Sequence, residues 1–230
     1  MFGSGDDTGI VSINTHNEAK RLAPLRVTEA YWHALCKDGE IPVRSAIDPR
    51  GMESALEHAF LLERIAPGMA KIRVAGSHLS DLMGMDVTGM PISAMIAAEG
   101  RDAFASAVTQ LFAEPAILRL SLKAQEGFGR PALSGEMIIL PLRSDFGEVT
   151  RALGAFVTDS RIGRAPRRFT LENVDIAPAA PNTLRRADLL HTAHTPAQAT
   201  PTRTAAPAAQ DAPAQDTPAR GHLRLVVSND

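Results

Sequence analysis

Alternating apolar and polar residues are the first regular feature of this sequence. Residues 69–75, MAKIRVA, alternate apolar side chains with Lys and Arg. Residues 117–124, ILRLSLKA, alternate leucines with Arg, Ser and Lys. Because successive side chains of a strand point to opposite faces, this period of two predicts strands with one buried and one wet face.

Further extended segments complete a five-stranded antiparallel sheet. Strands are expected over 59–65, 133–142 and 149–158, and short loops join the last three strands. Short connections favour antiparallel neighbours. The tripeptide Ala-Pro-Gly at 66–68 predicts a turn, because proline presets φ and glycine accepts positive φ. Residues 169–176 are expected to pack at the edge of the domain.

A period of 3.6 residues marks an early helix. Trp32, Leu35 and Cys36 form its apolar stripe. We expect this helix to begin at Thr28, whose hydroxyl can cap it, and to stop at Gly39. A helix with such a stripe is expected to dock on another surface.

Further helices are expected between the strands. Asp48 followed by Pro49 is a helix-start signal, and Ser77 can cap a short helix. A longer helix over 101–113 ends at Pro115. Its inner face consists of Phe104, Val108, Leu111 and Phe112.

Composition divides the chain into four parts. Residues 1–22 are polar without a sustained period, which predicts a flexible leader. Residues 23–176 hold the periodic segments and are expected to form one domain. Residues 177–220 are rich in Ala, Pro, Thr and Gln and are expected to be a disordered linker. Residues 221–230 alternate again and predict a short strand-like or docking segment.

Charge and cysteine content limit the classes of function. Lys+Arg 24 against Asp+Glu 26 gives a net charge of −2, so no global field attracts nucleic acid or an anionic membrane. The single cysteine, Cys36, excludes an internal disulfide framework and favours the cytoplasm. The N-terminus lacks the apolar stretch of about 7–15 residues of a secretory signal. No run of about 18 apolar residues occurs, so no membrane span is expected.

Four segments resemble a stand-alone PAS-like family of signalling proteins found in alphaproteobacteria. They are YWHALCKDGEIPVRSAIDPRGME (31–53), FLLERIAPGMAKIRVAGSHLSDLMGMDVTGMP (60–91), EGFGRPALSGEMIILPLR (126–143) and RALGAFVTDSRIGRAPRRF (151–169). The resemblance covers about residues 23–176. It implies an α+β, PAS-like fold, in which a five-stranded antiparallel sheet carries helices on one face after an N-terminal helical extension.

The family implies a cytoplasmic sensory or regulatory module that is not an enzyme. The residues agree, because the sequence shows no nucleophile with a neighbouring base, no paired carboxylates on one face and no phosphate loop. We therefore expect a module that acts through protein–protein interaction or self-association, with small-ligand binding as an open option. No nucleic-acid partner is expected.

Seven residues are candidates to line a ligand pocket between the sheet and its helices. Methionine thioethers adapt to irregular shapes, so they suit either a pocket or ordinary core filling, and core filling is the favoured interpretation. The alternative function is a haem- or flavin-bearing redox or gas sensor with its cofactor in this pocket. The candidate residues are Ile72, Met83, Met95, Phe104, Phe112, Leu120 and Ile138.

The sequence itself requires no cofactor or metal. Flavin-binding PAS domains carry an Asn-Cys-Arg-Phe-Leu type motif that this chain lacks, and the helix 101–113 has no histidine for haem. His78 is the one core candidate for haem, but its first-turn position is more typical of a half-exposed side chain. Cys36 is more typical of a packing residue than of a redox sensor. His191 and His194 lack further ligands nearby, so no metal site is expected.

Two other features concern contacts with partners. Tyr31, Trp32 and Leu35 are interaction candidates, because aromatic residues are common interface anchors. Their helix can cover the sheet of its own chain or pair with a second copy, and both outcomes stay open. The basic run Arg161–Arg168 is expected to be a solvated edge or to pair with carboxylates rather than to bind phosphate.

Overall fold

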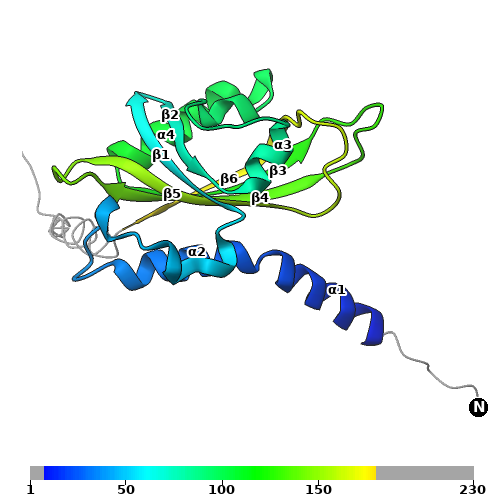
Figure 1. Cartoon of the computed structure of the whole chain (residues 1–230), viewed down its shortest axis with the longest axis horizontal. Helices are drawn as coiled ribbons and strands as arrows, with labels where there is room; N and C mark the ends of the chain where they lie inside the picture. Colours follow the sequence, from blue (N-terminus) through cyan, green and yellow to red (C-terminus); the bar gives the residue numbers. More distant parts are fainter. Residues whose placement is uncertain (1–7, 180–230) are drawn as a thin grey trace, which may run out of the picture. The chain divides into compact units, whose positions relative to one another are not determined.

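A six-stranded sheet lies at the centre of the computed structural model, which describes residues 8–179 (Figure 1). The strand order is β2-β1-β5-β4-β3-β6, and every neighbouring pair is antiparallel. The strands are β1 (Ala59–Ala66), β2 (Met69–Ala75), β3 (Ala116–Ala124), β4 (Ser134–Arg143), β5 (Val149–Thr158) and β6 (Phe169–Pro178). The five expected strands are present, and the segment expected at the domain edge forms a sixth beside β3.

One helical segment starts, and one helix ends, at a signal that the sequence shows. Within residues 8–179 they are α1 (Thr8–Arg21), α2 (Ala23–Leu35), α3 (Ser77–Met83) and α4 (Arg101–Ala113), with 3-10 segments η1 (Arg44–Ala46), η2 (Pro49–Ala55), η3 (Ile92–Met95) and η4 (Ala98–Gly100). The start signal at Asp48 is confirmed, since its carboxylate accepts a hydrogen bond from the Arg50 N–H at 3.0 Å. Helix α3 ends at Gly84, whose φ of 70° is left-handed.

An apolar core lies on each face of the sheet. Helices α3 and α4 cover one face, and α2 with η2 covers the other (Figure 1). The expectation of helices on one face is therefore incomplete. Residues 137–142 of β4 and 152–157 of β5 are buried without a break, which is the pattern of strands covered on both sides.

The expected flexible leader contains a helix. Residues 8–21 form α1, and backbone hydrogen bonds from Leu22 to Glu18 and from Arg26 to Leu22 continue the helical path into α2. None of the side chains of residues 15–21 is buried. This part of the helix has no buried face and therefore needs no apolar period, which is why the sequence pattern did not predict it.

Helix α2 starts earlier than expected. It begins at Ala23 with Pro24 in its first turn, where the missing N–H of proline leaves no bond unmade. Thr28, expected to cap the helix, lies inside it. Its buried hydroxyl donates to the Pro24 carbonyl oxygen at 2.8 Å, so the helix itself satisfies this side chain.

The domain extends slightly beyond its expected C-terminal limit. Strand β6 runs to Pro178, and the Ala179 N–H donates to the Pro115 carbonyl oxygen at 2.9 Å. The rest of the expected linker, to residue 220, and the expected docking segment 221–230 lie outside the described residues. In the described part of the chain, no helix is long and apolar enough to cross a membrane.

Candidate functional site

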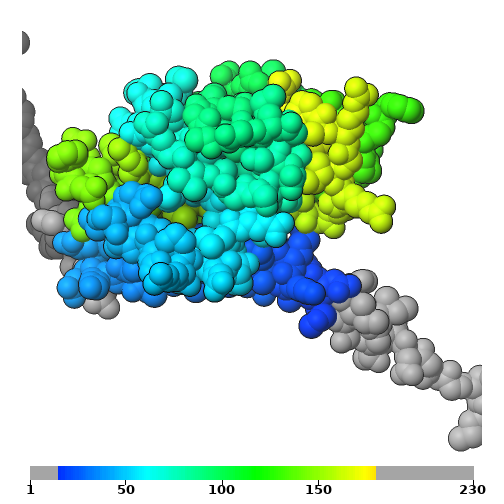
Figure 2. All heavy atoms as spheres, viewed as in Figure 1, coloured from blue at the N-terminus to red at the C-terminus, as the bar shows by residue number. Residues whose placement is uncertain are grey.

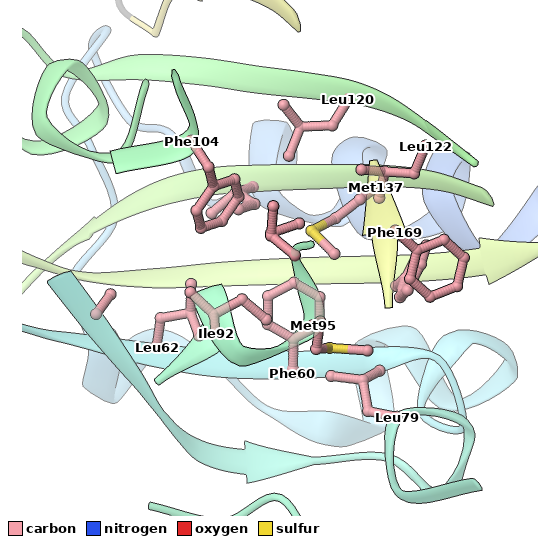
Figure 3. Packing of buried hydrophobic residues seen from close by; sticks show 14 of the residues in the cluster. Phe60, Leu62, Leu79, Ile92, Met95, Phe104, Leu120, Leu122, Met137 and Phe169 are labelled. Atoms are coloured by element: carbon pink, nitrogen blue, oxygen red, sulfur yellow. The ribbon is translucent and has the colours of Figure 1, made fainter. Parts of the chain in front are cut away.

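Six of the seven candidate pocket residues lie in the core between the sheet and helices α3 and α4. Each is at most 6% exposed. Figure 3 shows Met95, Phe104 and Leu120 in this cluster with Phe60 and Met137. The six residues are Ile72, Met83, Met95, Phe104, Phe112 and Leu120. The fold therefore brings them together from three helical segments and two strands, and their side chains fill this part of the core.

Ile138, the seventh candidate, lies on the opposite face of the sheet. It belongs to the core that contains Trp32, whereas its neighbours Met137 and Ile139 belong to the core under α3 and α4. Successive side chains of a strand point in opposite directions. The prediction for Ile138 is therefore wrong, because residues 137–140, MIIL, are all apolar and do not show which side chains face which core.

His78 is buried beside a second histidine. It is 8% exposed, and 4.7 Å separates its ring centroid from that of His58. Nε2 of His78 lies 3.4 Å from the Thr158 hydroxyl, and Nδ1 of His58 lies 3.1 Å from the Phe156 carbonyl oxygen. Burial first, and His58 second, lower the pKa of His78 to about 4. His78 is thus neutral at pH 7, and the expectation of a half-exposed side chain is wrong.

The described core does not fit haem or flavin. His78, the one haem candidate, has its ring against His58 and Phe156 and its Nε2 beside Thr158. The six candidate pocket residues in this core are all apolar, so their side chains offer no hydrogen bond to the polar edge of a flavin. Within residues 8–179, no group of three or more His, Cys, Asp or Glu is placed to hold a metal ion.

The three interaction candidates on α2 differ in how far they are buried or hydrogen-bonded within their own chain. Trp32 is fully buried, and its Nε1–H donates to the Pro141 carbonyl oxygen of β4 at 2.8 Å. The Tyr31 hydroxyl accepts a hydrogen bond from the Asp48 N–H at 2.7 Å, and Leu35 is half-buried. Of the two outcomes left open for this helix, the structure shows the one in which it covers its own sheet. Trp32 is therefore not free to contact a partner.

Cys36 follows α2 directly and is half-buried. Its Sγ lies 3.4 Å from the Trp32 carbonyl oxygen, and burial raises the pKa of the thiol. Because the thiolate is the reactive form, a raised pKa disfavours redox chemistry at neutral pH. The geometry supports the packing role expected from the sequence.

The basic run 161–168 contains one buried arginine. Arg167 is 1% exposed, and its guanidinium donates to three backbone carbonyl oxygens. This side chain is not solvated and forms no ion pair with a carboxylate among the described residues. The expectation therefore does not hold for Arg167. The letters RIGRAPRR contain no signal that separates it from its neighbours. The exposed members of the run are Arg161, Arg164 and Arg168.

A comparison with family models decides the family. The model described as PAS domain matches residues 20–157, which is more than half of the chain. The chain belongs to the PAS domain family. The PAS-like fold expected from the sequence is confirmed, and the protein is a sensory domain of a class that generally serves signalling. PAS domains are typically sensory rather than enzymatic, and they often mediate protein interaction.

Two solved structures are similar to part of this chain. The light-state structure of the LOV domain of the blue-light photoreceptor Aureochrome1 is 13% identical, with a TM-score of 0.34, and the match covers 49% of this chain and 88% of that chain. An RNA-binding light-oxygen-voltage receptor is 16% identical, with a TM-score of 0.35, and the match covers 70% of this chain and 43% of that chain. A search among curated proteins found no match.

Proposed function

We propose that this PAS domain is a non-enzymatic regulatory module of the cytoplasm that signals by binding a protein partner, either a different protein or a second copy. The observation that carries the proposal is the filled core between the sheet and helices α3 and α4, where the six candidate pocket residues are at most 6% exposed. A small ligand would have to displace these side chains or bind at the surface. We therefore assign the signal to protein contacts rather than to a haem or flavin.

Exposed aromatic side chains support a role in binding. Phe128 lies in the loop between β3 and β4, and Phe146 lies in the loop between β4 and β5, each 95% exposed. These loops lie at opposite ends of β4, as Figure 1 shows, so the two residues belong to opposite ends of the sheet. Large aromatic residues exposed to this degree are typical interface anchors.

Affinity capture followed by titration tests the proposal. The full chain, tagged and purified under native conditions, is the bait in a lysate of its source cells, and the tag alone is the control. We expect a stoichiometric protein partner, identified by mass spectrometry, that binds again when purified and titrated in a calorimeter. If no protein is enriched over the control and the chain stays monomeric over the concentration range studied, the proposal is contradicted.

A further inference from the structure

Backbone hydrogen bonding joins two loops at one end of the sheet. Loop 125–133 joins β3 to β4, and loop 159–168 joins β5 to β6 (Figure 1). The Arg164 N–H donates to the Gly129 carbonyl oxygen at 2.8 Å. At Gly163, where φ is 69°, an added Cβ atom would lie 2.7 Å from the same oxygen. The close approach of the two backbones therefore depends on glycine at this position.

Arg167 holds both loops from inside the fold. Its guanidinium donates to the carbonyl oxygens of Pro131 (2.7 Å) and Gln125 (3.4 Å) in the first loop and to that of Ile162 in the second. The backbone N–H of Arg167 donates to the Leu82 carbonyl oxygen at 2.7 Å. Carbonyl oxygens satisfy hydrogen bonds but carry no full negative charge, so the positive charge of Arg167 is not neutralised.

Three exposed arginines, one half-buried arginine and one exposed aromatic ring lie on the joined loops. Phe128 projects from a turn in which Gly127 and Arg130 exchange backbone hydrogen bonds of 2.9 and 3.0 Å. Figure 2 shows atoms of both loops side by side at this end, in green and yellow. We name this region the arginine surface, and it consists of Phe128, Arg130, Arg161, Arg164 and Arg168.

The arginine surface carries unbalanced charge. The ion pairs within residues 8–179 involve none of its arginines. The two loops contain five arginines and two carboxylates, Glu126 and Asp159, which leaves three positive charges in excess on a chain of net charge −2. Asp159 already accepts hydrogen bonds from the Ser134 N–H (2.9 Å) and the Ser160 hydroxyl (3.1 Å). Such a local field attracts an anionic partner.

We propose that the arginine surface binds an acidic segment of a partner protein, with Asp or Glu carboxylates on the arginines and an apolar side chain against Phe128. Guanidinium groups bind carboxylates through two parallel hydrogen bonds, and an exposed aromatic ring supplies the apolar anchor. Because Arg167 already holds the loops, binding orders little new structure. The choice of a protein over other anions rests on the proposed function, and a membrane, a nucleic acid and a second copy are alternative outcomes of the test.

Fluorescence anisotropy on the full chain tests this proposal. The probe is a fluorescein-labelled peptide in which glutamates alternate with leucines, and its counterpart has lysines in place of glutamates. We expect the native chain to bind only the acidic peptide, and R164E/R168E to bind it at least about tenfold more weakly. We expect Phe128→Ser to weaken binding by about threefold to tenfold. Added salt weakens the native interaction and leaves the residual binding of R164E/R168E nearly unchanged.

Matched variants separate this site from general charge and hydrophobicity. R50E/R64E makes the same charge change at two exposed arginines elsewhere, and Met69→Ser removes an apolar side chain that is 47% exposed at the start of β2. Both are expected to bind the acidic peptide as the native chain does. Circular dichroism melting confirms that each variant is folded, because all of these side chains lie at the surface.

Several outcomes overturn the proposal. They are absence of acidic-peptide binding by the native chain, equal weakening in R50E/R64E, and binding to phosphatidylserine vesicles or a single-stranded oligonucleotide in place of the peptide. Self-association that R164E/R168E abolishes, without peptide binding, assigns the surface to a second copy and also overturns it. A captured partner that binds native chain and R164E/R168E equally leaves the proposed function intact and rejects only this surface. Failure to capture any partner, together with a chain that stays monomeric, rejects the proposed function itself.

Discussion

Two basic side chains, Arg167 and His78, are buried without a neutralising partner. Arg167 keeps its charge among backbone carbonyls, and His78 loses its charge beside His58. These two solutions follow from chemistry, because a guanidinium cannot be deprotonated in a protein whereas an imidazole can. At neutral pH the domain therefore buries one cation and one neutral histidine.

The His78 environment predicts a stability that falls in mild acid. Its folded-state pKa of about 4 lies below the ordinary value of 6.5, under the influence of burial, His58 and, in the opposite sense, Asp81. Between those values the unfolded chain binds a proton that the folded chain does not, so acid favours unfolding. We expect the native chain to lose about 1–3 kcal/mol from pH 6.5 to pH 4.5 by this route. In urea denaturation, His78→Phe should lose less over the same interval.

The exposed His16 supplies the control for this prediction. His16→Gln removes a histidine whose side chain lies in solvent, so its pH dependence should equal that of the native chain. If His78→Phe and the native chain lose the same stability between pH 6.5 and pH 4.5, the burial of His78 does not govern the acid response.

Sequence reasoning succeeded at the residue scale where the decisive interaction is local. The Asp48 cap follows from a side chain and an N–H two residues away. His78 and Arg167 failed because their surroundings come from segments distant in sequence, such as Thr158 for the first and Pro131 for the second. No period or spacing near either residue reports those contacts.

At the scale of elements, strands were easier to predict than the faces they bury. Alternation and turn residues are local signals, and they placed β2 and β3 to within a residue. The unbroken apolar run of β4 shows that both faces are covered, yet it does not show which core receives Ile138. The apolar stripe of α2 predicted a docked helix, and the sheet supplies its docking surface.

The docking of α2 predicts a large dependence of stability on Trp32. Trp32→Ala removes a fully buried indole and should lower the free energy of unfolding by about 3–5 kcal/mol. Trp32→Phe keeps a ring but leaves the Pro141 carbonyl without its donor, and should cost about 1–3 kcal/mol. Denaturant unfolding followed by circular dichroism measures both losses. Tryptophan fluorescence does not serve here, because Trp32 is the single tryptophan of the chain.

The neighbouring His33 provides a matched site on the same helix. Its side chain is 54% exposed, so His33→Ala should change stability by no more than about 0.5 kcal/mol. A loss as small as this in Trp32→Ala would mean that α2 is not docked on the sheet in solution.

At the scale of the whole molecule, helices of the same chain cover both faces of the sheet. The loops are therefore the parts that can contact a partner. The domain was predicted to cover residues 23–176, and the fold continues to Ala179 at one end and includes α1 at the other. Residues 15–21 of α1 bury no side chain, and composition alone does not distinguish such a segment of helix from coil. The arginine surface was beyond prediction because the hydrogen bonds between its two loops join residues at least 28 positions apart in sequence, which meet only in the folded sheet.

Native mass spectrometry with a visible absorption spectrum tests most directly whether the core is filled by the chain itself. The full chain is purified without denaturation from cells supplied with haem and flavin precursors. We predict masses of the polypeptide alone or of its complexes with protein, and no visible absorption. A stoichiometric haem or flavin in the mass spectrum, with the matching absorption bands, would contradict the account.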